Sequence, residues 1–249
     1  MPLRETLPIS SFSWEERIIV ALDVASRTEA LRLITLLPQA KFFKVGLRLF
    51  VAEGPEFVEE IIKRGKEVFL DLKLHDIPNT VGQTVEEIVN LGVRMMSLHV
   101  AGGRMMMKRA VEAVQNLNAS KKKYPPLLLG VTVLTSLTPP DLQEIGVALE
   151  LSQQVVRLAR LAEECGLDGL ICSPQEVEEV RRIVNPEMIL ITPGIRPSWS
   201  TKNDQRRVTT PREAFQKGAD FIVVGRPIIA SSRPHEAFSR IVEEIKDLT

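Results

Sequence analysis

The segment KEVFLDLK at residues 66–73 decides the fold, because it places a strand-forming apolar run directly before a helical pattern at residues 80–91. Apolar side chains recur at three- and four-residue spacing in that second stretch, which is typical of an amphipathic helix. A strand followed by a helix is the repeating unit of parallel sheets. The rest of the chain repeats this unit.

Eight strand-like runs are predicted, near residues 17–23, 40–46, 66–73, 93–99, 127–134, 168–172, 187–192 and 219–224. Amphipathic stretches accompany them at 28–37, 55–64, 80–91, 104–117, 151–164, 174–184, 211–217 and 235–247. Eight strand-helix units in about 250 residues favour a closed (β/α)8 barrel over a doubly wound sheet, which usually has five or six strands. We therefore expect an α/β protein whose residues 1–249 form a single domain, with 1–16 as an N-terminal arm.

Residues typical of helix ends agree with this order. Ser173-Pro174 predicts a capped helix start with proline at the first helical position. Glycines at positions 65, 92, 166 and 218 follow predicted helices and precede strands, where a left-handed residue commonly ends a helix.

The composition narrows the possible partners and compartment. Thirty-two Lys and Arg residues balance 32 Asp and Glu residues, so no net charge favours nucleic acid or an anionic membrane. The two cysteines, Cys165 and Cys172, form no CxxC pair, which indicates a reducing compartment. No signal-peptide core or run of 18 apolar residues is present, so a cytoplasmic location is expected.

Charged residues converge at one end of the predicted barrel. Asp71 and Lys73 are two residues apart and share one face of their strand, while Leu70 and Leu72 share the face that meets the helices. The same alternation turns Lys44 inward. One interpretation is a salt-bridge network that closes the barrel; the other is a catalytic site, because a fixed ammonium beside carboxylates can stabilise a carbanion and then protonate it.

An anion site is predicted from the C-terminal part of the sequence, at the same mouth of the barrel. Gly225 and Arg226 follow the eighth strand, the usual phosphate position of such barrels, although an arginine paired with a helix carboxylate is the alternative. The polar loop 193–207 contains Arg196 and Gln205 and is interpreted as a lid over an anionic ligand. Thr135 and Ser136 follow the fifth strand, where hydroxyls either cap the loop or bind a ring edge.

The run DLKLHDIPNTV at residues 71–81 resembles the D-x-K-x-x-D-I-P-x-T signature of the orotidine 5'-phosphate decarboxylase family. Similar segments occur along nearly the whole chain: LDV, FKVG, VTVLTS, PGIR, DQRR and VVGRPI. The resemblance implies a barrel that converts orotidine 5'-monophosphate to uridine 5'-monophosphate without metal or organic cofactor. It also implies a homodimer.

The same resemblance implies roles for individual residues. Lys73 would protonate C6 of the pyrimidine, with Lys44, Asp71 and the neighbouring subunit's copy of Asp76 completing the charged row. The remaining substrate contacts would be Asp23 and Lys44 at the ribose, Thr80 toward the partner's substrate, Thr135 and Ser136 at the ring, Arg196, Gly225 and Arg226 at the phosphate, and Gln205 between phosphate and ring.

Two other functions are compatible with part of these motifs. A metal-assisted sugar-phosphate decarboxylase or aldolase can share D-x-K-x-x-D, but the I-P-N-T continuation and the LTS segment argue against it. A nucleotide sensor without catalysis is opposed by the presence of all four charged positions. His75 and His99 have no metal-ligand spacing, so no metal site is expected.

Overall fold

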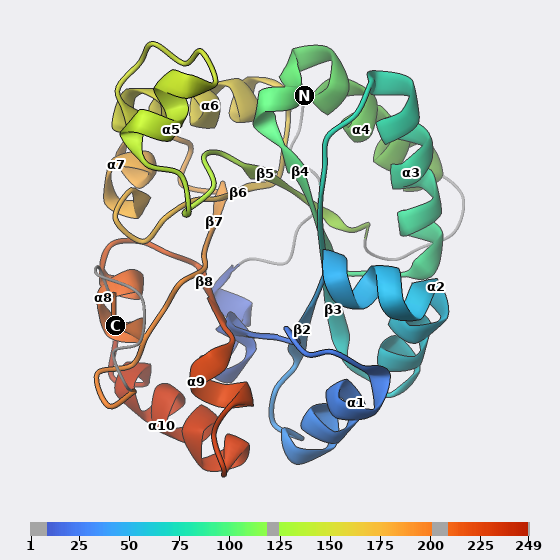
Figure 1. The fold of residues 1–249 in the computed structure, drawn as a ribbon, viewed down its shortest axis with the longest axis vertical. Coiled ribbons are helices and arrows are strands. Elements are labelled where there is room, and N and C mark those ends of the chain that lie inside the picture. Colours follow the sequence, from blue (N-terminus) through green and yellow to red (C-terminus); the bar gives the residue numbers. More distant parts are fainter. Residues whose placement is uncertain (1–8, 119–124, 201–208, 249) are drawn as a thin grey trace.

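The strands form a closed barrel in which all eight are parallel and neighbours in sequence are neighbours in space (Figure 1). This computed structural model describes residues 9–118, 125–200 and 209–248. The strands are β1 (Ile18–Ala21), β2 (Phe42–Gly46), β3 (Glu67–Leu74), β4 (Met95–His99), β5 (Leu127–Val131), β6 (Gly169–Ile171), β7 (Ile189–Thr192) and β8 (Phe221–Val224). The predicted (β/α)8 architecture and all eight strands are confirmed.

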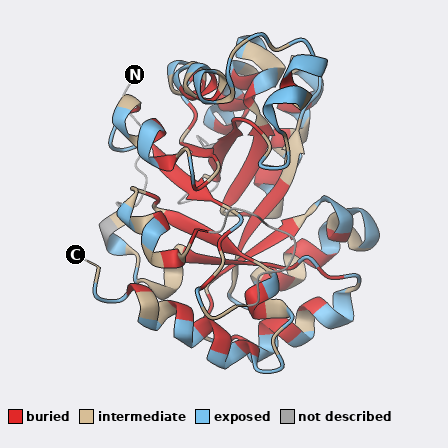
Figure 2. Cartoon of the chain, turned by 60° about the vertical axis from the view of Figure 1, so that its left-hand side comes forward, coloured by how far each residue is buried: buried red, intermediate tan, exposed pale blue. Residues whose placement is uncertain are grey.

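Helices surround the barrel and bury one side each against it (Figure 2). They are α1 (Arg27–Leu36), α2 (Leu47–Lys63), α3 (Pro78–Leu91), α4 (Gly103–Asn118), α5 (Pro139–Glu144), α6 (Leu151–Glu164), α7 (Val177–Ile183), α8 (Pro211–Gln216), α9 (Arg226–Ile229) and α10 (Pro234–Ile245). Short 3-10 turns are η1 (Ile9–Ser11), η2 (Glu15–Arg17) and η3 (Val100–Gly102). No helix in the described part of the chain is long and apolar enough to cross a membrane.

Two helix starts differ from the prediction. Helix α2 begins at Leu47 rather than near residue 55, because Gly54-Pro55 is a kink inside it, with Gly54 at φ 73°. Helix α7 begins at Val177, since Ser173 and Pro174 form a preceding turn in which the Ser173 amide donates to the Glu176 carboxylate at 3.1 Å. The predicted helix-end glycines are confirmed, all four with positive φ.

The core has two layers separated by the barrel wall. Strand residues facing outward, such as Phe43 and Leu70, pack against the helices. Those facing inward fill the barrel, led by Phe42, Phe69 and Phe221. Alternate residues of one strand therefore serve different cores, as the period of two requires.

The apolar filling of the barrel is replaced by polar groups two residues further along three neighbouring strands. Lys44 follows Phe42, Asp71 follows Phe69, and Ser97 follows Met95. Lys44, Asp71 and Ser97 are all buried. Because parallel strands end at the same side of the barrel, this polar layer forms the floor of its C-terminal mouth.

The N-terminal segment packs against the opposite end of the barrel filling. The ring of Phe12 packs against those of Phe42 and Phe221, with centroid separations of 6.0 and 5.4 Å, and these two rings also contact each other at 5.8 Å. Ile9 joins the same apolar cluster. The described part of the predicted arm thus completes the interior core, which the strands alone leave open.

Replacing Phe12 with Ala should lower the free energy of unfolding by about 2–4 kcal/mol, because one ring is removed from a cluster of three. Urea denaturation followed by circular dichroism measures this loss. Ile145, which is 67% exposed, is the control, and Ile145→Ala should change stability by less than about 0.5 kcal/mol. Equal stability of the two variants would contradict the packing role of Phe12.

Candidate active site

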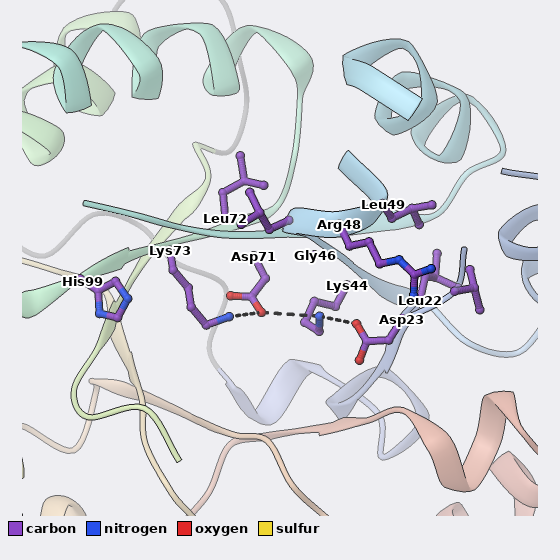
Figure 3. A pocket seen from close by; sticks show the side chains of 12 residues that line it. Leu22, Asp23, Lys44, Gly46, Arg48, Leu49, Asp71, Leu72, Lys73 and His99 are labelled. Carbon is purple, nitrogen blue, oxygen red and sulfur yellow. Dashed lines mark hydrogen bonds and ion pairs between the residues drawn. The ribbon is translucent and has the colours of Figure 1, made fainter. Parts of the chain in front are cut away.

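Four charged side chains form a continuous row across the barrel mouth (Figure 3). The Lys73 ammonium donates to Asp71 Oδ2 at 2.8 Å, and the Lys44 ammonium lies 3.6 Å from the same oxygen. Lys44 also donates to Asp23 Oδ1 at 3.0 Å. The order Lys73, Asp71, Lys44, Asp23 alternates positive and negative charge and comes from β3, β2 and the end of β1. The predicted convergence of Lys44, Asp71 and Lys73 is confirmed.

The inner members of the row are buried and its ends are open. The side chains of Asp71 and Lys44 are 9% and 11% exposed, compared with 35% for Lys73 and 60% for Asp23. Burial alone would raise the pKa of the Asp71 carboxyl, but Lys44, Lys73 and the hydrogen bonds from Lys73 and Ser97 hold it below its ordinary value. Asp71 is therefore ionised at neutral pH, and it holds two ammonium groups in place.

Lys73 has an unusual backbone. Its φ of 53° makes it the only non-glycine residue with positive φ in the described part of the chain. Leu70 pairs with Met96 of β4, whereas Leu74 pairs with Leu98, so β3 accommodates extra residues between these points. A left-handed conformation costs an L-residue about 1–2 kcal/mol and such strain concentrates at functional sites. The irregularity includes Lys73, the residue predicted to be catalytic.

A cavity of about 580 Å³ opens above the row. Its lining includes Asp23, Lys44, Asp71, Lys73 and His99. The His99 ring stands 5.3 Å from that of His75, and burial, then His75 and Lys73, lower the pKa of His99. This imidazole is neutral at neutral pH and adds no positive charge beside Lys73.

Asp76 and Thr80 lie apart from the row. Both are exposed at the start of α3, and Asp76 Oδ1 accepts a hydrogen bond from the Ile77 amide at 2.7 Å. Neither lines the cavity above the row. Within one chain, therefore, these two predicted site residues are exposed and do not belong to the cavity.

A second cavity of about 810 Å³ lies among the loops that follow β5, β6 and β7. Thr135, Gly194 and Glu176 line it, and Ser136 is exposed nearby in the chain. The Arg196 amide, near the start of the predicted lid loop, donates to the carbonyl of Thr209, which follows the loop, at 3.0 Å. Gln205 and residues 201–208 lie outside the described part of the chain.

The turn after β8 meets the charged row. Gly225 precedes α9, and a Cβ placed there would lie 3.5 Å from Asp23 Oδ2. That is an ordinary contact, so packing in the free protein does not by itself require glycine at this position. Arg226 is exposed at the first position of α9, where a bound anion would also meet helix amides.

Sequence reasoning left three residues of this region without a role. Ser97 carries a hydroxyl in the otherwise apolar run MMSL of the fourth strand. The available signal was its alternation with Met96 and Leu98, which turns it toward the inside of the barrel. His99, two residues further along, is expected on the same face of the strand. Glu176 gave no local signal, since its burial arises from loops that are distant in sequence.

The arrangement of these groups defines a chemistry. A half-exposed ammonium, fixed by a buried carboxylate and open to a cavity, can stabilise negative charge on a bound molecule and transfer a proton to it. Within the described residues no group of three or more His, Cys, Asp or Glu side chains could hold a metal ion. Fold and site together define a (β/α)8-barrel enzyme with a Lys-Asp-Lys centre.

Comparisons with known proteins identify the family. Residues 16–241 match the model of the orotidine 5'-phosphate decarboxylase / HUMPS family. The orotidine 5'-phosphate decarboxylases of Syntrophomonas wolfei and Syntrophotalea carbinolica are 50% and 49% identical, over 94% and 92% of this chain and 99% and 95% of theirs. The crystal structure of orotidine 5'-phosphate decarboxylase from Lactobacillus acidophilus superposes with a TM-score of 0.82 at 35% identity, covering 92% of this chain and 98% of that one. The chain belongs to the orotidine 5'-phosphate decarboxylase / HUMPS family.

Glu176, in the lining of the second cavity, makes the stability of the protein depend on pH. Burial raises the pKa of its carboxyl from the ordinary 4.5 to about 7, although the Ser173 amide opposes this shift. Between these two values the unfolded chain loses the proton and the folded chain keeps it, so stability falls as pH rises toward 7. Above that value the folded protein carries a constant penalty.

Glu176→Gln removes the ionisation and keeps an acceptor for Ser173. We compare the free energy of unfolding of the variant with that of the parent protein at each pH. The stability that the variant gains over the parent should be about 1–3 kcal/mol larger at pH 8 than at pH 4.5. Denaturant titrations at the two pH values measure this difference, with the exposed Glu112→Gln as control. An identical pH dependence in all three proteins would show that Glu176 ionises normally.

Proposed function

We propose that the protein decarboxylates orotidine 5'-monophosphate to uridine 5'-monophosphate and CO2 in de novo pyrimidine biosynthesis. The observation that carries the proposal is the buried Asp71 carboxylate with an ammonium on each side, open to a cavity at the barrel mouth. The names of the relatives support orotidine 5'-monophosphate as the substrate. Membership of the family supports a carboxy-lyase reaction.

In the proposed mechanism the bond between C6 and the substrate carboxylate breaks, CO2 leaves, and the electron pair stays on C6. That pair lies in the plane of the ring, where the π-system cannot delocalise it, so direct electrostatic stabilisation is required. The Lys73 ammonium stabilises the pair and then donates its proton to C6. Asp71 holds this ammonium in place through their ion pair, Lys44 contacts the same Asp71 oxygen from the other side, and no cofactor or metal takes part.

The proposal also assigns the substrate contacts. Asp23 and Lys44 bind ribose hydroxyls, which fits the position of Asp23 at the open end of the row and its contact with Lys44. Thr135 and Ser136 bind the ring edge from the loop after β5. Arg196, Gly225 and Arg226 bind the phosphate, and Gln205 joins phosphate and ring.

We further propose a homodimer in which Asp76 and Thr80 serve the partner's site. Both are exposed in the single chain, as a shared site requires. Large apolar side chains nearby are exposed as well: Leu47 (59%), Val51 (76%), Ile77 (66%) and Met105 (70%), on or beside α2, α3 and α4. These three helices are neighbours in the ring around the barrel (Figure 1). Exposed large apolar side chains on neighbouring helices support an interface on this side of the barrel.

Two further expectations remain proposals of the same kind. We take the whole of residues 1–249 as one decarboxylase domain, with residues 1–16 as its arm. A cytoplasmic location fits the two buried free cysteines.

Mixing the pure protein with orotidine 5'-monophosphate should lower the substrate's ultraviolet absorbance, with and without a chelator. Lys73→Ala should reduce this turnover by at least ~10³-fold, since it removes both the stabilising charge and the proton donor. The variant should still bind uridine 5'-monophosphate. Lys63→Ala, which removes an exposed lysine paired with Glu59, is the control and should remain fully active.

Turnover that requires a metal would instead support the sugar-phosphate type of chemistry. Nucleotide binding without turnover in the parent protein would support the sensor. Near-normal activity of Lys73→Ala would refute the assigned proton donor.

Mixed dimers test the shared site. Asp76→Ala and Lys73→Ala homodimers should each be nearly inactive, whereas a mixed dimer contains one site with both residues intact. Equal amounts and free exchange make about half of the dimers mixed, so roughly a quarter of all sites should recover activity. Activity is measured after co-expression, with mixed dimers verified by native mass spectrometry. If verified mixed dimers show no recovery, Asp76 acts within its own chain.

A further inference from the structure

Ser97 occupies the floor of the mouth, next to the charged row. It lies in the middle of β4, is 1% exposed, and follows the inward-facing Met95 by two residues. Its hydroxyl accepts a hydrogen bond from the Lys73 amide at 2.9 Å and donates one to Asp71 Oδ1 at 2.8 Å. One buried hydroxyl therefore contacts both residues at the centre of the site.

The hydrogen bond from Ser97 to Asp71 fixes the orientation of the Asp71 carboxylate. Oδ2 faces the ammonium groups of Lys73 and Lys44, whereas Oδ1 accepts from Ser97. Without that donor, a buried carboxylate oxygen would lose its partner, and the carboxylate would gain freedom to rotate about the bond that joins it to Cβ. A charge-assisted hydrogen bond of this kind is about twice as strong as a neutral one.

The hydrogen bond from the Lys73 amide to Ser97 holds the Lys73 backbone. The register of β3 against β4 shifts between Leu70 and Leu74, so the regular ladder is interrupted at Lys73. The Ser97 hydroxyl takes the place of a strand carbonyl as the acceptor for the Lys73 amide. It thereby satisfies a main-chain donor in the left-handed conformation that would otherwise be costly to maintain.

We propose that Ser97 is a positioning residue that sets the direction of the Lys73 ammonium by holding the Asp71 carboxylate and the Lys73 main chain together. It is not among the residues that line the cavity above the row. Its effect is on the geometry of the row, and the kinetic part of this inference rests on the proposed function.

Ser97→Ala should lower kcat for orotidine 5'-monophosphate by about 10–100-fold, because a small displacement of a catalytic group is costly, while KM changes less than about threefold. The matched control is Thr132, a buried residue of the adjoining segment after β5, whose hydroxyl donates to the Ile171 carbonyl at 3.3 Å. Thr132→Val removes a buried hydroxyl without touching the row and should retain kcat. Equal losses in the two variants, or a loss confined to KM in Ser97→Ala, would overturn the proposal.

A second measurement does not depend on activity. Titration of the Asp71 carboxyl by carbon-13 NMR should show a higher pKa in Ser97→Ala than in the parent protein, because a hydrogen bond to the ionised form has been lost. Thr132→Val should show no change. If Ser97→Ala does not fold, Ser97→Cys keeps a weak donor of similar shape and should raise the same pKa.

The two readouts separate this inference from the proposed function. A parent protein that fails to turn over orotidine 5'-monophosphate contradicts the proposed function, and the Asp71 titration then still decides whether Ser97 holds the row. A parent protein that is active, with an Asp71 pKa unchanged in Ser97→Ala, contradicts the positioning role alone.

Discussion

The Asp71 carboxylate between the ammonium groups of Lys44 and Lys73 is the interaction on which the site depends. An isolated carboxylate as buried as Asp71 would cost several kcal/mol and would take up a proton. Two ammonium groups and a serine hydroxyl compensate that cost, so the carboxylate stays ionised. In return, it holds Lys73 in one place, half exposed to the cavity. Removing either lysine would leave the remaining charges unbalanced.

Such a row needs a rigid support, and the barrel supplies it. Phe42, Phe69 and Met95 fill the interior directly beneath Lys44, Asp71 and Ser97. Each polar residue is thus two positions further along a strand than an apolar one. Phe12 extends this filling at the far end of the barrel. Close packing below the row leaves its side chains little room to move in that direction.

The surroundings of the row divide it into a fixed part and an open part. Asp71 and Lys44 are enclosed by strands, whereas Asp23 and Lys73 reach solvent. The turn at Gly225 brings the end of β8 next to Asp23, so the first and last strands meet at the same edge of the site. The neutral imidazole of His99 forms part of the other edge. The open ends of the row therefore lie where a ligand can approach.

The amino-acid sequence by itself determined the order of strands and helices, because apolar periodicity and helix-end glycines are local signals. It also determined which side chains of β2 and β3 face inward, since alternation in a strand fixes Lys44 and Asp71 on the side opposite Phe43 and Leu70. The helix starts at Leu47 and Val177 were missed, because a Gly-Pro kink and a capped turn resemble helix boundaries. Only the tertiary structure decided the distances within the row, the register shift that gives Lys73 a positive φ, and the contact of Ser97 with both Asp71 and Lys73. Apart from the one between Lys73 and Asp71, the hydrogen bonds among these contacts join neighbouring strands of the barrel whose residues are 21 to 26 positions apart in the chain, and no local pattern specifies such a pairing.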